Sequence, residues 1–217
     1  MDATRAGRPR LTERRRPGTT AREEILDAAG ELFTTRGYAS TSTRAIAEAV
    51  GIRQASLYHY FKTKDELLSA LLHQTVTPTL AYLATLEQGP AAHTLHALAA
   101  FDGGQLLTSR WNLGALYLLP ELREARLATF WTERERLRLA YLDLSRAILV
   151  TTGVTDDAAD LPFRLVESLV NMWSRPARPD QDTLAGHVAD ACLRVLGVTD
   201  DTLAALRASG PARVGRL

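Results

Sequence analysis

Cysteine is almost absent from this chain of 217 residues, in which Cys192 is the single example. One cysteine excludes an internal disulfide and indicates a reducing compartment. Long hydrophobic runs are also lacking, since no apolar stretch approaches the roughly 20 residues that a transmembrane helix needs. The start of the chain is polar and rich in arginine, unlike a secretory signal. We therefore expect a cytoplasmic protein without a membrane partner.

Lysine is equally scarce and occurs only at positions 62 and 64, so arginine supplies the other basic side chains. Together with the high alanine content, this indicates a GC-rich bacterial genome such as that of an actinobacterium. The net charge of +1 conceals an asymmetry. Residues 1–64 contain 12 Arg or Lys against 7 Asp or Glu, whereas residues 65–217 contain 14 against 18. A basic end on a mildly acidic body is typical of DNA-binding proteins.

The most informative stretch is residues 41–64, TSTRAIAEAVGIRQASLYHYFKTK. Its spacing predicts two short helices that meet at a tight corner and place the second helix in a DNA major groove. Ala47 is small enough for close helix approach, and Gly51 suits the positive φ of the turn. The apolar positions that would face inward are Ile46, Val50, Ile52 and Leu57.

An ordinary αα-hairpin with a polar outer face would have similar spacing, so the flanks matter. Thr20 and Glu23 form the pattern of a capping box before a helix that should end near Gly37. Thr63 and Glu66 repeat the pattern before a further helix. Three helices and the start of a fourth therefore fit within about residues 20–70.

These residues resemble the DNA-binding domain of the TetR family of bacterial transcription regulators. The resemblance rests on Phe33 with Gly37-Tyr38, on Ile46-Ala47 with Gly51-Ile52, and on the run Leu57 to Lys64. It is specific over residues 20–70 and weaker beyond them. It implies an all-α protein of about nine helices, in which a helix-turn-helix domain precedes a domain for ligand binding and dimerisation.

The second helix of the motif should present hydrogen-bonding groups to DNA. Gln54 could pair with adenine, the methyl of Ala55 could touch thymine, and Tyr58 could reach a phosphate. The start of the preceding helix, with Thr43 and Arg44, should face a phosphate. The resemblance adds Lys64 as a phosphate anchor. The full prediction comprises Arg8, Arg10, Thr43, Arg44, Arg53, Gln54, Ala55, Ser56, Tyr58, His59, Tyr60, Lys62 and Lys64.

Residues 1–19 hold six arginines interleaved with glycine and proline, which predicts a disordered arm. Arg8 and Arg10 could enter an A·T-rich minor groove. A solvated tail that only attracts phosphates has the same composition. We assign residues 1–19 to this arm, 20–66 to the helix-turn-helix domain, 67–208 to the body and 209–217 to a frayed tail.

The body reads as helices throughout, including one from Lys64 to about Glu87 that Pro78 should bend or break, and another over about 158–174. Two late apolar stripes exceed what one internal contact requires. Family members pair such helices with their copies, and a twofold dimer would set two recognition helices about 34–36 Å apart. The predicted dimer residues are Leu165, Val166, Leu169, Leu184, Val188, Ala191 and Val195.

The resemblance also implies a ligand pocket in the body, lined by aromatic residues and a few polar groups. Any one of these side chains could equally be core. The predicted lining is Phe101, Gln105, Trp111, Leu116, Tyr117, Phe130, Trp131, Tyr141, Asn171 and Trp173.

Catalytic chemistry is not expected, because no nucleophile–base pair or metal cluster is evident and no cofactor motif is present. The resemblance implies a homodimeric repressor that a small, largely apolar ligand releases from a palindromic operator. The alternative is a DNA-binding regulator or activator whose body binds a protein partner and has no ligand cavity.

Overall fold

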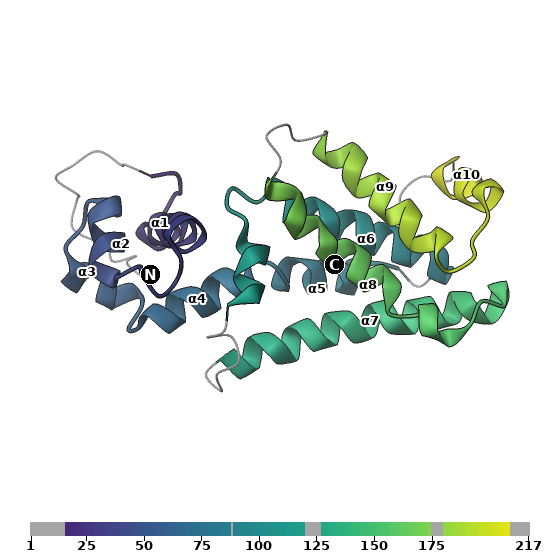
Figure 1. The fold of residues 1–217 in the computed structure, drawn as a ribbon, viewed down its shortest axis with the longest axis horizontal. Coiled ribbons are helices and arrows are strands. Elements are labelled where there is room, and N and C mark those ends of the chain that lie inside the picture. The colour runs from purple at the N-terminus through teal and green to yellow at the C-terminus, as the bar shows by residue number, and fades with distance from the viewer. Residues whose placement is uncertain (1–15, 88, 120–126, 175–179, 209–217) are drawn as a thin grey trace, which may run out of the picture. The chain divides into compact units, whose positions relative to one another are not determined.

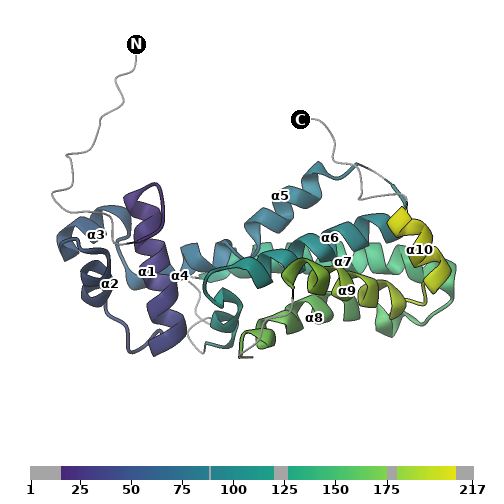
Figure 2. The same ribbon diagram turned by 90° about the horizontal axis from the view of Figure 1, so that it is seen from above.

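The structure, a computed structural model, describes residues 16–87, 89–119, 127–174 and 180–208. Every regular element in these ranges is a helix, so the predicted all-α fold is confirmed (Figures 1 and 2). The chain divides into two compact units, residues 1–68 and 69–217, and α4 (Lys64–His73) has residues in both. The predicted tail, residues 209–217, lies outside the described residues.

The first unit begins with α1 (Ala21–Arg36), which starts at the expected capping box. The Thr20 hydroxyl accepts the Glu23 N–H at 3.2 Å, and the Glu23 carboxylate accepts the Thr20 N–H at 3.1 Å. The two residues thus satisfy backbone donors that no helical carbonyl can reach. The buried side chains of α1 that make its apolar face are Ile25, Leu26, Ala28, Ala29, Leu32 and Phe33.

The helix-turn-helix consists of α2 (Thr43–Val50) and α3 (Gln54–Tyr60). Gly51 joins them with φ 78°, a left-handed conformation that a residue with a Cβ rarely adopts. Its N–H donates to the Glu48 carbonyl at 3.1 Å and so closes the end of α2. The predicted inner face is buried apart from Ile52, which is half-buried; its buried members are Ile46, Ala47, Val50 and Leu57.

The helix expected from Lys64 to about Glu87 is broken into α4 and α5 (Thr77–Thr85). Pro78 lies in the first turn of α5, where its missing N–H and fixed φ are tolerated. The proline therefore starts a new helix.

The second unit is built around α6 (Ala91–Thr108), which packs against α5, α7 (Ala128–Thr152), α8 (Leu161–Glu167) and α9 (Gln181–Arg194). Figure 2 shows α6 running beside α7 and α9. A final helix, α10 (Asp200–Ala208), follows α9. The α6 residues that form the centre of this core are Leu95, Leu98 and Ala99, all 0% exposed.

The described residues of this unit also include the 3-10 segments η1 (Leu113–Leu118), η4 (Asp156–Ala158) and η5 (Ser168–Ser174). The expectation of one helix over 158–174 is therefore wrong, because the α-helix ends at Glu167. The Asn112 side chain donates to the Val170 carbonyl at 2.9 Å, which joins η1 to η5. A Cβ on Gly114 would overlap Val170, so this close approach requires glycine.

Candidate nucleic-acid interface

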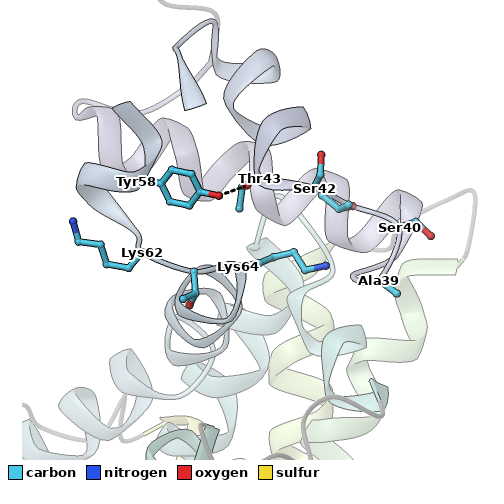
Figure 3. Close-up of a pocket in the computed structure, with 9 residues that line it drawn as sticks. Ala39, Ser40, Ser42, Thr43, Tyr58, Lys62 and Lys64 are labelled. Carbon is cyan, nitrogen blue, oxygen red and sulfur yellow. Dashed lines mark hydrogen bonds between the residues drawn. The ribbon is translucent and has the colours of Figure 1, made fainter. Parts of the chain in front are cut away.

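An open groove of about 440 Å³ lies in the first unit, between the start of α2, α3 and the start of α4 (Figure 3). Its lining is rich in hydroxyl and ammonium groups and has no carboxylate: Ala39, Ser40, Thr41, Ser42, Thr43, Tyr58, Lys62, Thr63 and Lys64. The groove includes the N-terminus of α2, where backbone N–H groups lack helical partners. Hydroxyls, ammonium groups and helix N-termini are the groups with which proteins bind phosphates.

Thr43, Gln54 and Tyr58 form a hydrogen-bonded triangle at this groove. The Thr43 and Tyr58 hydroxyl oxygens lie 3.1 Å apart, and the Gln54 amide donates to them at 2.9 and 3.3 Å. Figure 3 shows the Tyr58 hydroxyl directed at Thr43. The tyrosine is 39% exposed, and its contacts with Thr43 and Gln54 fix its hydroxyl. The structure thus brings together three predicted residues from two helices.

Lys64 is held at the start of α4 by Tyr38. The ammonium donates to the Tyr38 carbonyl at 2.9 Å and lies 4.1 Å from the centre of the Tyr38 ring. The Tyr38 hydroxyl in turn donates to Asp65. An ammonium has three donors, so Lys64 can contact an anion while it stays on Tyr38. The sequence pattern around Tyr38 carries the family resemblance and gives no sign of this positioning role.

The remaining predicted DNA-binding residues occupy exposed positions in the first unit, except that Ser56 is half-buried. Arg44 forms an exposed ion pair with Glu48 at 2.9 Å, and this hydrogen bond raises the guanidinium pKa. Such exposed pairs contribute little to stability, so Arg44 can exchange Glu48 for a phosphate. The others are Arg53, Ala55, His59, Tyr60 and Lys62. Arg8 and Arg10 lie outside the described residues.

In the second unit, three of the predicted pocket residues touch one another. The ring centres of Tyr117 and Phe130 are 5.6 Å apart, and those of Phe130 and Trp131 are 5.3 Å apart. The guanidinium of Arg134 lies over both Tyr117 and Trp131 and forms an ion pair with Glu167. Burial raises the pKa of Tyr117 above its ordinary value.

The other predicted pocket residues are scattered over the unit. Phe101 stacks on Tyr82 at 4.1 Å, and Trp111 lies under the Arg110 guanidinium. Asn171 is exposed. Gln105 is half-buried, Leu116 is fully buried, and the side chain of Trp173 lies outside the described part of the structure.

Tyr141, also predicted for the pocket, is fully buried and donates to the carboxylate of Asp102 at 3.0 Å. Thr79 donates to the other carboxylate oxygen at 2.9 Å. Burial raises the pKa of Asp102 to about 6, against the two hydrogen bonds, which lower it. Asp102 could not be predicted from the sequence, because its position among the small residues of α6 gives no sign that it is covered.

The predicted dimer residues fall into two groups. Val166 and Leu169 are 1% and 3% exposed, so other residues of the same chain already cover them. Leu169 packs with Leu107 and Ala185, which belong to α6 and α9. The other predicted members are half-buried and thus reachable from outside: Leu165, Leu184, Val188, Ala191 and Val195.

Within the described residues, no group of three or more His, Cys, Asp or Glu side chains could hold a metal ion. The helices of that same part of the chain are too short or too polar for a membrane span. Cys192 is buried, and burial raises the pKa of its thiol to about 12. The thiol is therefore protonated at neutral pH and a poor nucleophile.

Two short helices joined at Gly51, with an exposed polar second helix beside a hydroxyl-lined groove, define a helix-turn-helix protein. Residues 25–71 match the family of bacterial regulatory proteins named tetR. The crystal structure of Mycobacterium smegmatis AmtR is 55% identical, with a TM-score of 0.83, and the match covers 91% of this chain and 97% of that one. The repressor Rv1474c of Mycobacterium tuberculosis is 30% identical over 151 residues, or 69% of this chain and 77% of that protein.

This chain belongs to the TetR family. The prediction from the motif is thereby confirmed, as is the expectation of a regulator and not an enzyme. The repressor KstR2 of Rhodococcus jostii is 45% identical over 51 residues, and this match spans 24% of the chain and 25% of that protein. The chain thus spans about a quarter of the length of this curated relative. AibR in complex with isovaleryl coenzyme A and operator DNA shares the fold at 20% identity and a TM-score of 0.59, covering 78% of this chain and 96% of that one.

Proposed function

We propose that this chain is a homodimeric repressor that binds a palindromic operator and is released by a small, largely apolar ligand. The observation that carries the proposal is the groove lined by Thr43, Tyr58 and Lys64 beside the exposed face of α3. A phosphate in this groove would fix the register of the protein on the duplex. Gln54 and Ala55, at the start of α3, would then meet base edges in the major groove.

Dimer formation is supported by the half-buried stripe of α9. Leu184, Val188, Ala191 and Val195 recur at helical spacing beside the face that packs on α6. A second copy that covers this stripe would remove apolar surface from water. A twofold dimer would also explain how one short recognition helix per subunit yields specific binding, because two half-sites are read together.

The ligand proposal rests on the aromatic cluster of Tyr117, Phe130 and Trp131 in the body. These rings favour a ligand with substantial apolar surface. AibR, which has this fold, was crystallised with isovaleryl coenzyme A and operator DNA. We propose that ligand entry repacks the body around α4, which has residues in both units and so can transmit the change.

The alternative is a body that binds a protein partner. An open groove of about 680 Å³ on α7 supports it, because Trp131, Leu139 and Ala140 contribute apolar surface there. Leu139 is 44% exposed, which is high for a leucine in mid-helix. The two proposals differ in what should release DNA. A small molecule alone would suffice in the first, whereas a protein would be needed in the second.

Selection of bound sequences from a random DNA pool tests the main proposal. Purified protein at physiological salt should enrich a palindromic consensus whose half-sites are about one helical turn apart. A search of the source genome with this consensus would indicate the regulated genes and the ligand class. Binding without a consensus, which simply weakens as salt rises, would contradict a specific regulator.

A further inference from the structure

One arginine of the basic N-terminal segment is turned inward. The Arg16 guanidinium donates to Asp27 at 3.0 Å and to Glu31, two carboxylates one turn apart on α1. Its side chain is 14% exposed and that of Asp27 is 11% exposed. Two carboxylates therefore compensate the positive charge of Arg16. In this respect Arg16 differs from the basic residues that are predicted to contact DNA.

The same side chain reaches the end of α2. Its Nε lies 3.4 Å from the carbonyl oxygen of Ala49, the second-last residue of that helix. The carbonyls of Ala47 and Glu48 are already satisfied by the N–H groups of Gly51 and Ile52. Arg16 thus adds to the cap of α2 from a distant part of the chain, and its positive charge suits a helix C-terminus.

The corner that Arg16 holds is the one that sets the direction of α3. This helix has seven residues, of which Leu57 is buried, and it begins without a side-chain cap. Gln54 and Tyr58 bond it to Thr43 of α2, so the orientation of α3 follows that of α2 and of the turn between them. A recognition helix that tilts slightly loses base contacts while its phosphate contacts persist.

We propose that Arg16 is a positioning residue for operator recognition: it clamps the α2–α3 corner to α1 and makes no contact with DNA. This inference rests on the proposed operator binding. A guanidinium suits the task because its planar fork can serve three acceptors at once, which the ammonium of lysine matches poorly. The clamp acts on affinity for the operator, and it does so without adding positive charge to the DNA-binding surface.

The decisive variant removes the carboxylates and keeps the arginine. Asp27→Asn with Glu31→Gln makes the first unit more positive by two charges. If Arg16 were a phosphate contact, releasing it would tighten binding to all DNA. As a positioning residue, its release should weaken operator binding about tenfold and leave nonspecific binding unchanged or stronger. Fluorescence anisotropy with operator and scrambled duplexes measures both, and tighter operator binding would overturn the proposal.

Arg16→Ala gives the complementary measurement. Operator affinity should fall about tenfold while the slope of log affinity against log salt stays unchanged. Arg44→Ala is the matched control, an exposed arginine whose loss should reduce that slope by about one. A slope that also falls by about one in Arg16→Ala would make Arg16 a phosphate contact. Circular dichroism and urea unfolding show whether Arg16→Ala is still folded. If it is not, the Asp27→Asn, Glu31→Gln variant tests the proposal in its place.

A double-mutant cycle that combines Arg16→Ala with Arg8→Ala and Arg10→Ala distinguishes an effect of Arg16 on the α2–α3 corner from an effect on the N-terminal arm. The loss caused by Arg16→Ala should be the same in both backgrounds if Arg16 acts through α3. If the loss disappears in the Arg8, Arg10 variant, Arg16 acts only by anchoring the arm and the proposal fails. Failure of the operator proposal is separate, because the unaltered protein would then select no consensus sequence.

Discussion

Asp102→Asn should stabilise this protein at neutral and alkaline pH. Asp102 is 4% exposed, and its two hydrogen-bond donors, Thr79 and Tyr141, are neutral. Burial raises the pKa of this carboxyl from 3.8 to about 6. A carboxyl with a raised folded-state pKa resists ionisation, so the free energy of unfolding decreases as pH rises from about 4 to about 6.

The pKa of Asp102 is raised by roughly two units, so its ionisation lowers the free energy of unfolding by about 3 kcal/mol above pH 6. At pH 5 about half of this penalty remains, because the folded-state carboxyl is mostly protonated there. Asparagine cannot ionise, so the substitution should remove the part of this loss in unfolding free energy that depends on pH. It also alters the hydrogen bonds with Thr79 and Tyr141, at a cost of about 1 kcal/mol that does not vary with pH.

Urea unfolding between pH 5 and pH 8, at one fixed protein concentration, measures the effect. The gain in unfolding free energy on Asp102→Asn should increase with pH by about 1 to 2 kcal/mol across this range. Asp143→Asn is the control, since it makes the same chemical change at an exposed position of α7. A gain that is identical at pH 5 and pH 8 would refute the argument that burial penalises the Asp102 charge.

Three further predictions concern DNA binding and assembly. Tyr58→Phe should weaken operator binding by up to about tenfold, because it removes the hydroxyl that bonds Thr43 and Gln54. A gel-shift titration measures this, and unchanged affinity would exclude a role for the hydroxyl. Lys64→Ala should reduce the salt slope of operator binding by about one, and a slope equal to that of the unaltered protein would show that Lys64 serves only Tyr38. Val188→Glu should convert the proposed dimer to a monomer, as measured by light scattering after size exclusion. Val150→Glu, at an 85% exposed site on α7, is the control and should leave the dimer intact. If the Val188→Glu variant is still a dimer, the α9 stripe is not the interface.

The sequence predicted the helix-turn-helix because its determinants are local. The capping box at Thr20, the positive φ at Gly51 and the apolar spacing of α2 and α3 each depend on residues within one or two turns. The exposed face of α3 followed from the same periodicity, since the residues that do not face inward must face outward.

Prediction was less successful in the body, where several helices share one core. Val166 and Leu169 belong to a stripe that was predicted to face a second subunit, but both are buried in one chain, and Leu107 of α6 and Ala185 of α9 pack against Leu169. An apolar stripe shows that something must cover it and leaves open which element does. The pocket residues were difficult to predict for the same reason. Tyr141 bonds the buried Asp102 whereas Tyr117 lies against Phe130, and no local sequence pattern encodes this difference.

What the sequence by itself determined is thus the DNA-binding end: its helices, its corner and the polar face of its recognition helix. Only the tertiary structure decided that Asp102 lies in an apolar core and that the charge of Arg16 is compensated by α1. The physical reason is that burial and ion pairing join residues far apart in the chain. Arg16 meets Ala49 across 33 positions, and Asp102 meets Tyr141 across 39.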